Sequence, residues 1–146
     1  MSIINVVGAK IWGGGEQYVY DICKQLQQRH RTAYILVDQS NEDMQSRYAQ
    51  VGHVMTANLY TLKGFLSVNA VAKQVKEQGI NTIVCHSGKY ILFCIALKQL
   101  TGAKLVFIKH NLVPGKTDMY HRWINAQVDA FVCVSKLVYD DLMTPV

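Results

Sequence analysis

Six short apolar runs alternate along this chain with segments of helical periodicity, and this alternation most restricts the possible fold. The apolar runs cover residues 3–9, 32–38, 52–57, 81–87, 104–110 and 129–135. Such runs are typical of strands that are buried on both faces of a sheet. Helices are expected over residues 15–30, 65–79, 89–102, 118–127 and 136–143. The pattern predicts an α/β fold with a doubly wound, parallel, six-stranded, Rossmann-like sheet.

The composition restricts the class of protein. The chain has 146 residues, of which 50% are hydrophobic and 17% charged, so we expect residues 1–146 to form one domain with its own core. No apolar stretch is long enough to span a bilayer, and the N-terminus lacks the basic region of a signal peptide. The four cysteines form no CxxC pair and have no metal-ligand spacing, which favours a reducing, cytoplasmic location.

The net charge of +5 fits an anionic ligand, a lipid surface or no partner at all. The sequence has no arginine-rich stripe and no nucleic-acid reader motif, so we expect no nucleic-acid partner.

Three consecutive glycines lie between the first predicted strand and the first predicted helix. In a doubly wound sheet, ligands bind beyond the carboxyl ends of the strands, near the first strand. Free amides at a helix N-terminus attract anions, and glycine lets a phosphate or a sugar approach the backbone. The residues alone leave two interpretations of Gly13–Gly15 open: an anion site, or a plain flexible turn.

A dinucleotide fingerprint is a weaker interpretation of the same glycines. Gly13 and Gly15 have the spacing of G-x-G-x-x-G, but Tyr18 stands at the last position. Asp38, at the end of the second strand, is a poor substitute for the acidic residue that binds a ribose. A nicotinamide-dependent oxidoreductase domain therefore remains an alternative.

Four segments in register resemble the N-terminal domain of a GT-B glycosyltransferase of the family 4 (group 1) type. They are GGGE with the helix and strand that follow it, NTIVCHS ending near His86, KLVFIKH ending at His110, and VDAFVCVS with Asp129 and Ser135. In this family the N-terminal domain mainly binds the acceptor, and the C-terminal domain binds the nucleotide sugar and carries an E-x7-E motif. No glutamate pair has that spacing here, so we expect this chain to be the N-terminal half, without the C-terminal domain.

The resemblance implies retaining transfer of a sugar from a nucleotide-diphosphate donor to a glycan or lipid-linked acceptor, as in polysaccharide or lipopolysaccharide synthesis. It implies no cofactor and no obligatory metal. Peripheral contact with the cytoplasmic membrane face is a further expectation, drawn from the apolar and basic stretch 58–76. We expect the chain alone to be inactive. A non-catalytic α/β module that binds an anionic ligand at the glycine loop is a second alternative.

The resemblance also assigns roles to residues at matching positions. His110 is the expected catalytic residue, hydrogen-bonded to the transferred sugar; its plainer role is a loop histidine bonded to local backbone. Residues expected to bind the donor diphosphate and sugar are Gly13, Gly14 and Gly15. Residues expected to bind the acceptor are His86, Ser87, Lys89 and Lys116.

Overall fold

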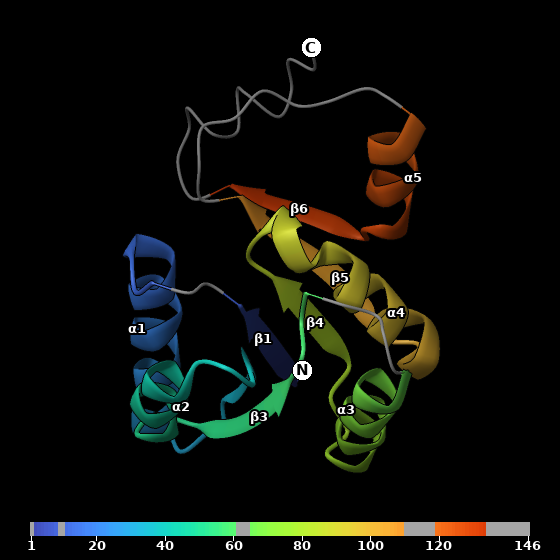
Figure 1. The fold of residues 1–146 in the computed structure, drawn as a ribbon. Helices are drawn as coiled ribbons and strands as arrows, with labels where there is room; N and C mark the ends of the chain where they lie inside the picture. The colour runs from blue at the N-terminus through green and yellow to red at the C-terminus, as the bar shows by residue number, and fades with distance from the viewer. Residues whose placement is uncertain (1, 9–10, 61–64, 110–118, 134–146) are drawn as a thin grey trace.

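The computed structural model describes residues 2–8, 11–60, 65–109 and 119–133 (Figure 1). The strands are β1 (Ile3–Val7), β2 (Tyr34–Asp38), β3 (His53–Ala57), β4 (Thr82–Cys85), β5 (Lys104–Lys109) and β6 (Ala130–Cys133). The helices are α1 (Gly14–Gln28), α2 (Glu42–Ala49), α3 (Phe65–Glu77), α4 (Ile91–Thr101) and α5 (Met119–Gln127), with a 3-10 turn η1 (Gly88–Tyr90) before α4.

The six strands form one sheet in the order β3-β2-β1-β4-β5-β6, and each neighbouring pair is parallel. The predicted doubly wound sheet is therefore confirmed. β1 lies between β2 and β4, so the chain changes direction across the sheet at β1. The carboxyl end of β1 is consequently the point where such sheets bind ligands.

Helices cover both faces of the sheet (Figure 1). Helices α1 and α2 lie together on one face (Figure 1), where their buried side chains share a core with Val7 of β1 and with Ile35 and Val37 of β2. Helices α3 and α4 cover the other face, and Ile124 of α5 joins the same core. Successive strand residues point to opposite faces, so a strand covered on both sides needs a continuous apolar run.

Helix α2 is absent from the elements that the sequence predicts. It has eight residues, and it buries only Met44 and Tyr48, one turn apart. Two apolar positions in a polar segment leave little periodic signal. The last predicted helix, over residues 136–143, lies outside the described residues.

Candidate functional site

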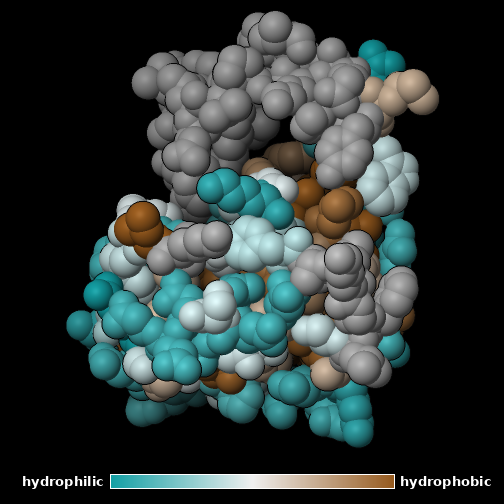
Figure 2. Space-filling model, in the orientation of Figure 1, coloured by the Kyte–Doolittle hydropathy of each residue, from teal (hydrophilic) through white to brown (hydrophobic). Residues whose placement is uncertain are grey.

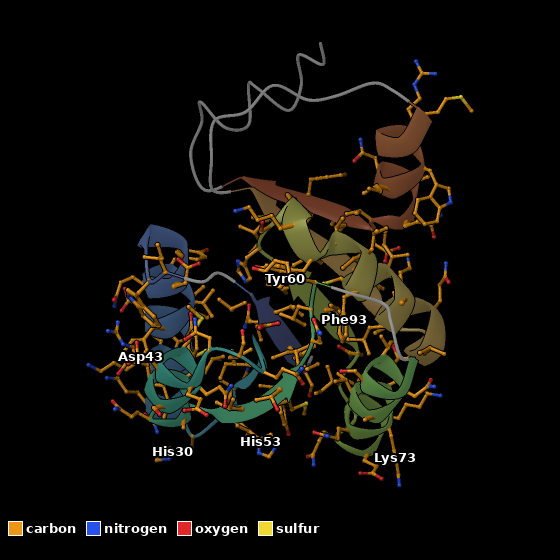
Figure 3. All side chains as sticks on the ribbon, in the orientation of Figure 1. His30, Asp43, His53, Tyr60, Lys73 and Phe93 are labelled. Atoms are coloured by element: carbon orange, nitrogen blue, oxygen red, sulfur yellow. The ribbon has the colours of Figure 1, made fainter. Side chains whose placement is uncertain are left out.

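The candidate site lies at the carboxyl end of the sheet, where the segment after β1 leads into α1. Figure 3 shows Tyr60 at this end, between α1 and α4, and His30 and His53 at the opposite end of the molecule. The residues that follow β2, β3 and β4 reach the same edge, because the strands are parallel.

The glycine run forms the start of α1. Gly13 precedes the helix in an extended conformation, with φ −144° and ψ −163°. Its amide donates to Oε2 of Glu16 at 3.0 Å, and its carbonyl accepts from the amide of Gln17 at 3.0 Å. Glycine has no side chain with which to cap the helix, and within the described residues no hydrogen bond occupies the amides of Gly14 and Gly15. Free amides at the positive end of a helix are suited to bind an anion.

Neither backbone conformation nor packing within the described residues requires glycine at position 14. The glycines with a positive φ among the described residues are Gly79 and Gly102, not those of the run. A Cβ added to Gly14 would meet no heavy atom within 4 Å, whereas a Cβ at Gly8 would lie 2.7 Å from the Tyr90 ring. A Cβ at Gly52 would lie 2.6 Å from the carbonyl oxygen of Ala33. The surface beside Gly14 is therefore open to a group from outside this domain.

Asp38 orders the carboxyl ends of β2 and β3. Its side chain is buried, and its carboxylate accepts from the amide of Leu59 at 3.1 Å. It also accepts from the amide of Ser40 at 3.2 Å and from the Ser40 hydroxyl. These three donors hold the carboxylate in a structural role, which weakens the interpretation of Asp38 as a ribose-binding acid.

Two tyrosines close the end of β1. The Tyr60 hydroxyl donates to the carbonyl of Gly8, and the Tyr60 ring meets Tyr90 edge-on with centroids 6.4 Å apart. Partial burial, followed by the charges of Asp38 and Glu16, raises the pKa of Tyr60. Burial also raises the pKa of Tyr90, against the opposing effect of a backbone hydrogen bond from Gly8. Both phenols therefore stay protonated, and Tyr60 keeps the proton that it donates to Gly8.

The predicted acceptor residues after β4 lie next to one another and already have structural contacts. Nε2 of His86 lies 2.9 Å from Oδ1 of the buried Asn5, and an amide oxygen accepts, so this nitrogen donates. Oγ of Ser87 accepts from the amide of Lys89 at 3.2 Å and so caps η1. The Lys89 side chain is exposed. Acceptor binding by these residues stays a prediction.

Two predicted site residues cannot be placed. His110 and Lys116 lie outside the described residues, and β5 ends just before them at Lys109. The roles assigned to them stay predictions.

Sequence reasoning did not single out Asn5, Tyr60 or Tyr90. The sequence cue for Asn5 is that a polar residue stands inside an otherwise apolar strand. The structure shows that its side chain is buried. Tyr60 stands three residues after β3, and its place beyond the end of a parallel strand is the signal that points to it.

Residues 58–76 are the stretch proposed for membrane contact. The described part of this stretch packs mainly in the core. Its buried apolar residues are Leu59, Val68, Val71, Ala72 and Val75. Within the described parts of the chain, no helix is both long and apolar enough to cross a bilayer. Exposed apolar side chains among the described residues include Tyr60 of this stretch, two on α4 and others on α5 and β6, and Figure 2 shows apolar residues above a mostly hydrophilic lower surface. Peripheral membrane contact stays a prediction.

Among the described residues, no group of three or more His, Cys, Asp and Glu side chains could hold a metal ion.

Comparison with known proteins gives one family match. The family model described as Glycosyltransferase Family 4 matches residues 12–145. No curated protein sequence matches.

Solved structures share the fold at low sequence identity. A glycosyltransferase from Rickettsia africae is 18% identical, with a TM-score of 0.80, and the match covers 99% of this chain and 39% of that one. Alr3699/HepE from Anabaena, in complex with UDP-glucose, is 16% identical, with a TM-score of 0.69 over 98% of this chain and 40% of that one. The lipopolysaccharide outer core galactosyltransferase WaaB is 13% identical, with a TM-score of 0.66, and the match covers 98% of this chain and 42% of that one. This chain therefore spans about 40% of the length of these proteins.

Proposed function

The chain belongs to glycosyltransferase family 4, and we propose that it forms the N-terminal half of a retaining GT-B enzyme. In this proposal the enzyme transfers a sugar from a nucleotide-diphosphate donor to a glycan or lipid-linked acceptor. The observation that carries the proposal is Gly14 at the start of α1: its φ is not positive, and an added Cβ would meet no heavy atom within 4 Å, so neither backbone conformation nor packing within the described residues calls for glycine there. The complex of Alr3699/HepE with UDP-glucose supports a nucleotide sugar as the donor class.

The chemistry follows from the amides of Gly14 and Gly15. As the bond between sugar and diphosphate breaks, negative charge builds on the departing phosphate. Amides that are held in place before the reaction stabilise this charge, and the positive end of α1 adds to the effect. The Glu16 carboxylate lies in the same turn, but it already accepts from the amide of Gly13. We place the donor diphosphate on the side of Gly14, where an added Cβ would meet no heavy atom.

The remaining roles complete the proposal. His110 hydrogen-bonds the transferred sugar, and His86, Ser87, Lys89 and Lys116 line the acceptor side. The donor-binding E-x7-E motif comes from a second domain. A non-catalytic module that binds an anion at the same loop is the second candidate function, because the free amides of α1 alone would serve it equally well.

Gly14→Ala in the full-length enzyme tests the proposal, with Gly14→Val as a stronger variant. Alanine suits a first-turn helical position better than glycine, by roughly 0.5–1 kcal/mol, so folding should be unharmed. Its Cβ would occupy the space that the diphosphate needs. Losing one held donor typically lowers turnover about a hundredfold to a thousandfold. The measurements are the melting temperature, kcat and the KM for the donor on the same preparations.

Gly52→Ala is the matched control, because its Cβ would collide with the carbonyl of Ala33 at the opposite end of the sheet. It should lower the melting temperature, and activity should fall only in proportion to the folded protein lost. If the Gly14 variants behave in the same way, the run is a plain turn and the proposal is wrong. Donor binding without turnover in the wild-type protein would favour the non-catalytic module.

A further inference from the structure

The start of α1 is held from outside the helix. Inside the first turn the Glu16 carboxylate accepts from the Gly13 amide, but glycine is a poor helix former, so the turn depends further on contacts from outside the helix. The two residues that hold it are Trp12, directly before the run, and Tyr48, on α2. Figure 1 shows α1 and α2 side by side on the same face of the sheet.

Trp12 joins the loop to both helices. Its indole Nε1 donates to Oε1 of Gln17 at 3.1 Å, and the Gln17 amide group donates in turn to Asp21 at 3.0 Å. The indole ring lies 5.2 Å from the Tyr48 ring and 5.9 Å from the Tyr20 ring, measured between centroids.

Arg47 covers the same indole. The Arg47 guanidinium lies 4.8 Å from the Trp12 ring centroid, and an ion pair with Asp43 at 3.3 Å orients it. A cation over an indole face is a favourable arrangement. Helix α2 therefore supports Trp12 through both Arg47 and Tyr48.

Tyr48 contacts the first turn of α1 directly. Its side chain is fully buried, and its hydroxyl donates to the backbone carbonyl of Glu16 at 2.9 Å. Burial, followed by the charges of Glu16 and Cys23, raises the pKa of Tyr48 above its usual range. The hydroxyl therefore remains a donor at every working pH. Glu16 directly follows Gly15, so this bond anchors the turn that carries the two free amides.

We propose that Tyr48 is a positioning residue for the donor diphosphate, acting through the Glu16 carbonyl on the amides of Gly14 and Gly15. This inference rests on the proposed function. Tyr48 touches no reacting atom, and Trp12, whose ring packs against the Tyr48 ring, serves the same purpose. Losing the Tyr48 hydroxyl should leave the fold intact and let the first turn move, which weakens phosphate binding.

Tyr48→Phe in the full-length enzyme tests the inference, with inorganic pyrophosphate as the probe. The matched control is Tyr34→Phe, which removes a hydroxyl bonded to Gln78 Oε1 at 3.3 Å, from the first residue of β2. Calorimetry should show pyrophosphate binding about threefold to tenfold weaker in Tyr48→Phe, since one hydrogen bond is lost. Tyr34→Phe should bind like the wild type. The KM for the acceptor should change in neither variant, and a purely structural role for Tyr48 would not produce this selectivity.

Gly14→Val separates the two ways of failing. The pyrophosphate binding that depends on the glycine loop is defined as the binding that is lost in Gly14→Val. If Gly14→Val has no effect on pyrophosphate binding, the proposed function of the loop fails, and this inference fails with it. If Gly14→Val weakens binding and Tyr48→Phe does not, only the role of Tyr48 is wrong.

Trp12→Phe keeps the inference testable if Tyr48→Phe does not fold. It keeps an aromatic ring at this half-buried position, while it removes the indole donor to Gln17 and reduces the ring surface that faces Tyr48 and Arg47. Weaker pyrophosphate binding with an unchanged acceptor KM supports the inference. Binding equal to that of the wild type overturns it.

Discussion

At the scale of single residues, His30 occupies a backbone conformation that normally belongs to glycine. Its φ is +58°, the only positive value at a non-glycine among the described residues. The amide of Arg31 bonds the Leu26 carbonyl and the amide of His30 bonds the Gln27 carbonyl, which is the Schellman pattern that ends a helix. Helix α3 ends in the same way, but with Gly79 at the equivalent position and φ +68°. The chain thus carries the same turn with and without a Cβ.

We expect His30→Gly to stabilise the protein. The left-handed conformation costs a residue with a Cβ about 1–2 kcal/mol, and glycine avoids this cost. Glycine also has more conformational entropy in the unfolded state, which lowers stability by about 0.4–1 kcal/mol. The net gain should be about 0.5–1 kcal/mol in urea unfolding. Gly79→Ala is the reciprocal variant and should lose about 1 kcal/mol. Turnover should not change, since His30 lies at the opposite end of the molecule from Tyr60 (Figure 3). A loss of stability in His30→Gly would contradict the assignment.

Asp129 directly precedes β6 and belongs to the segment VDAFVCVS, which resembles the glycosyltransferase family. Its contacts with other described residues are structural. Its Oδ2 accepts from the Leu105 amide at 2.7 Å and pairs with Lys98 Nζ at 3.0 Å. The Leu105 amide first, and then Lys98, lower the pKa of Asp129 from its ordinary value of 3.8. Since the folded pKa is depressed, the carboxylate stabilises the fold above that value, and this contribution disappears as pH falls through the folded pKa.

Asp129→Asn should therefore destabilise the protein at pH 7 more than at pH 3. Asparagine can still accept from Leu105, but it carries no charge for Lys98. Urea unfolding of both proteins at pH 7, 5 and 3 checks the prediction, and the two stabilities should converge in acid. A difference that is constant over this range would mean that the charge of Asp129 contributes nothing.

At the scale of elements, α2 shows how a short helix becomes stable. Asn41 caps it, with Oδ1 accepting from the Met44 amide at 3.0 Å. Glu42 and Asp43 occupy the first turn and Arg47 the last, in agreement with the helix dipole. Packing of Met44 and Tyr48 on the sheet supplies the rest. The helix in turn presents Tyr48 and Arg47 to the start of α1.

Asn41→Ala should destabilise the protein by about 1 kcal/mol, because the Met44 amide loses its acceptor. Asn41→Asp keeps an acceptor and should cost much less. Chemical denaturation of both variants measures the difference. If the two variants lose equal stability, Asn41 does not cap the helix.

At the scale of the whole molecule, the sheet brings strand ends together at one edge, and the chain spans about 40% of its structural relatives. Chemistry at that edge depends on holding donor and acceptor together. Each face of the sheet carries a cluster of buried apolar residues, from which we expect the chain to fold by itself.

We accordingly expect purified residues 1–146 to fold cooperatively but neither to transfer sugar nor to hydrolyse nucleotide sugars. Circular dichroism on heating checks the first part, and an assay of nucleotide release from UDP-glucose and other common donors checks the second. The full-length enzyme is the positive control. Turnover by this chain alone would show that it needs no second domain.

The strands and the longer helices could be predicted from the sequence because their signal is local. A continuous apolar run defines a strand covered on both sides, and the spacing of Val68, Val71, Ala72 and Val75 defines one face of a helix. The helices expected over residues 65–79 and 89–102 each end at a glycine, and both Gly79 and Gly102 have a positive φ. The position of the glycine run at the start of the first helix was also visible in the sequence.

Whether a glycine could accept a side chain depends on residues that are far away in the chain. Gly8 is packed against Tyr90, and Gly52 against Ala33, while Gly14 meets nothing, and no local pattern distinguishes the three. Helix α2 escaped prediction because burial of two side chains against the sheet, not a periodic pattern, stabilises it. The bond from Tyr48 to Glu16 joins residues 32 apart, and that between His86 and Asn5 joins residues 81 apart. Such contacts exist only once the strands have paired, because sheet pairing is what brings distant segments within hydrogen-bonding distance.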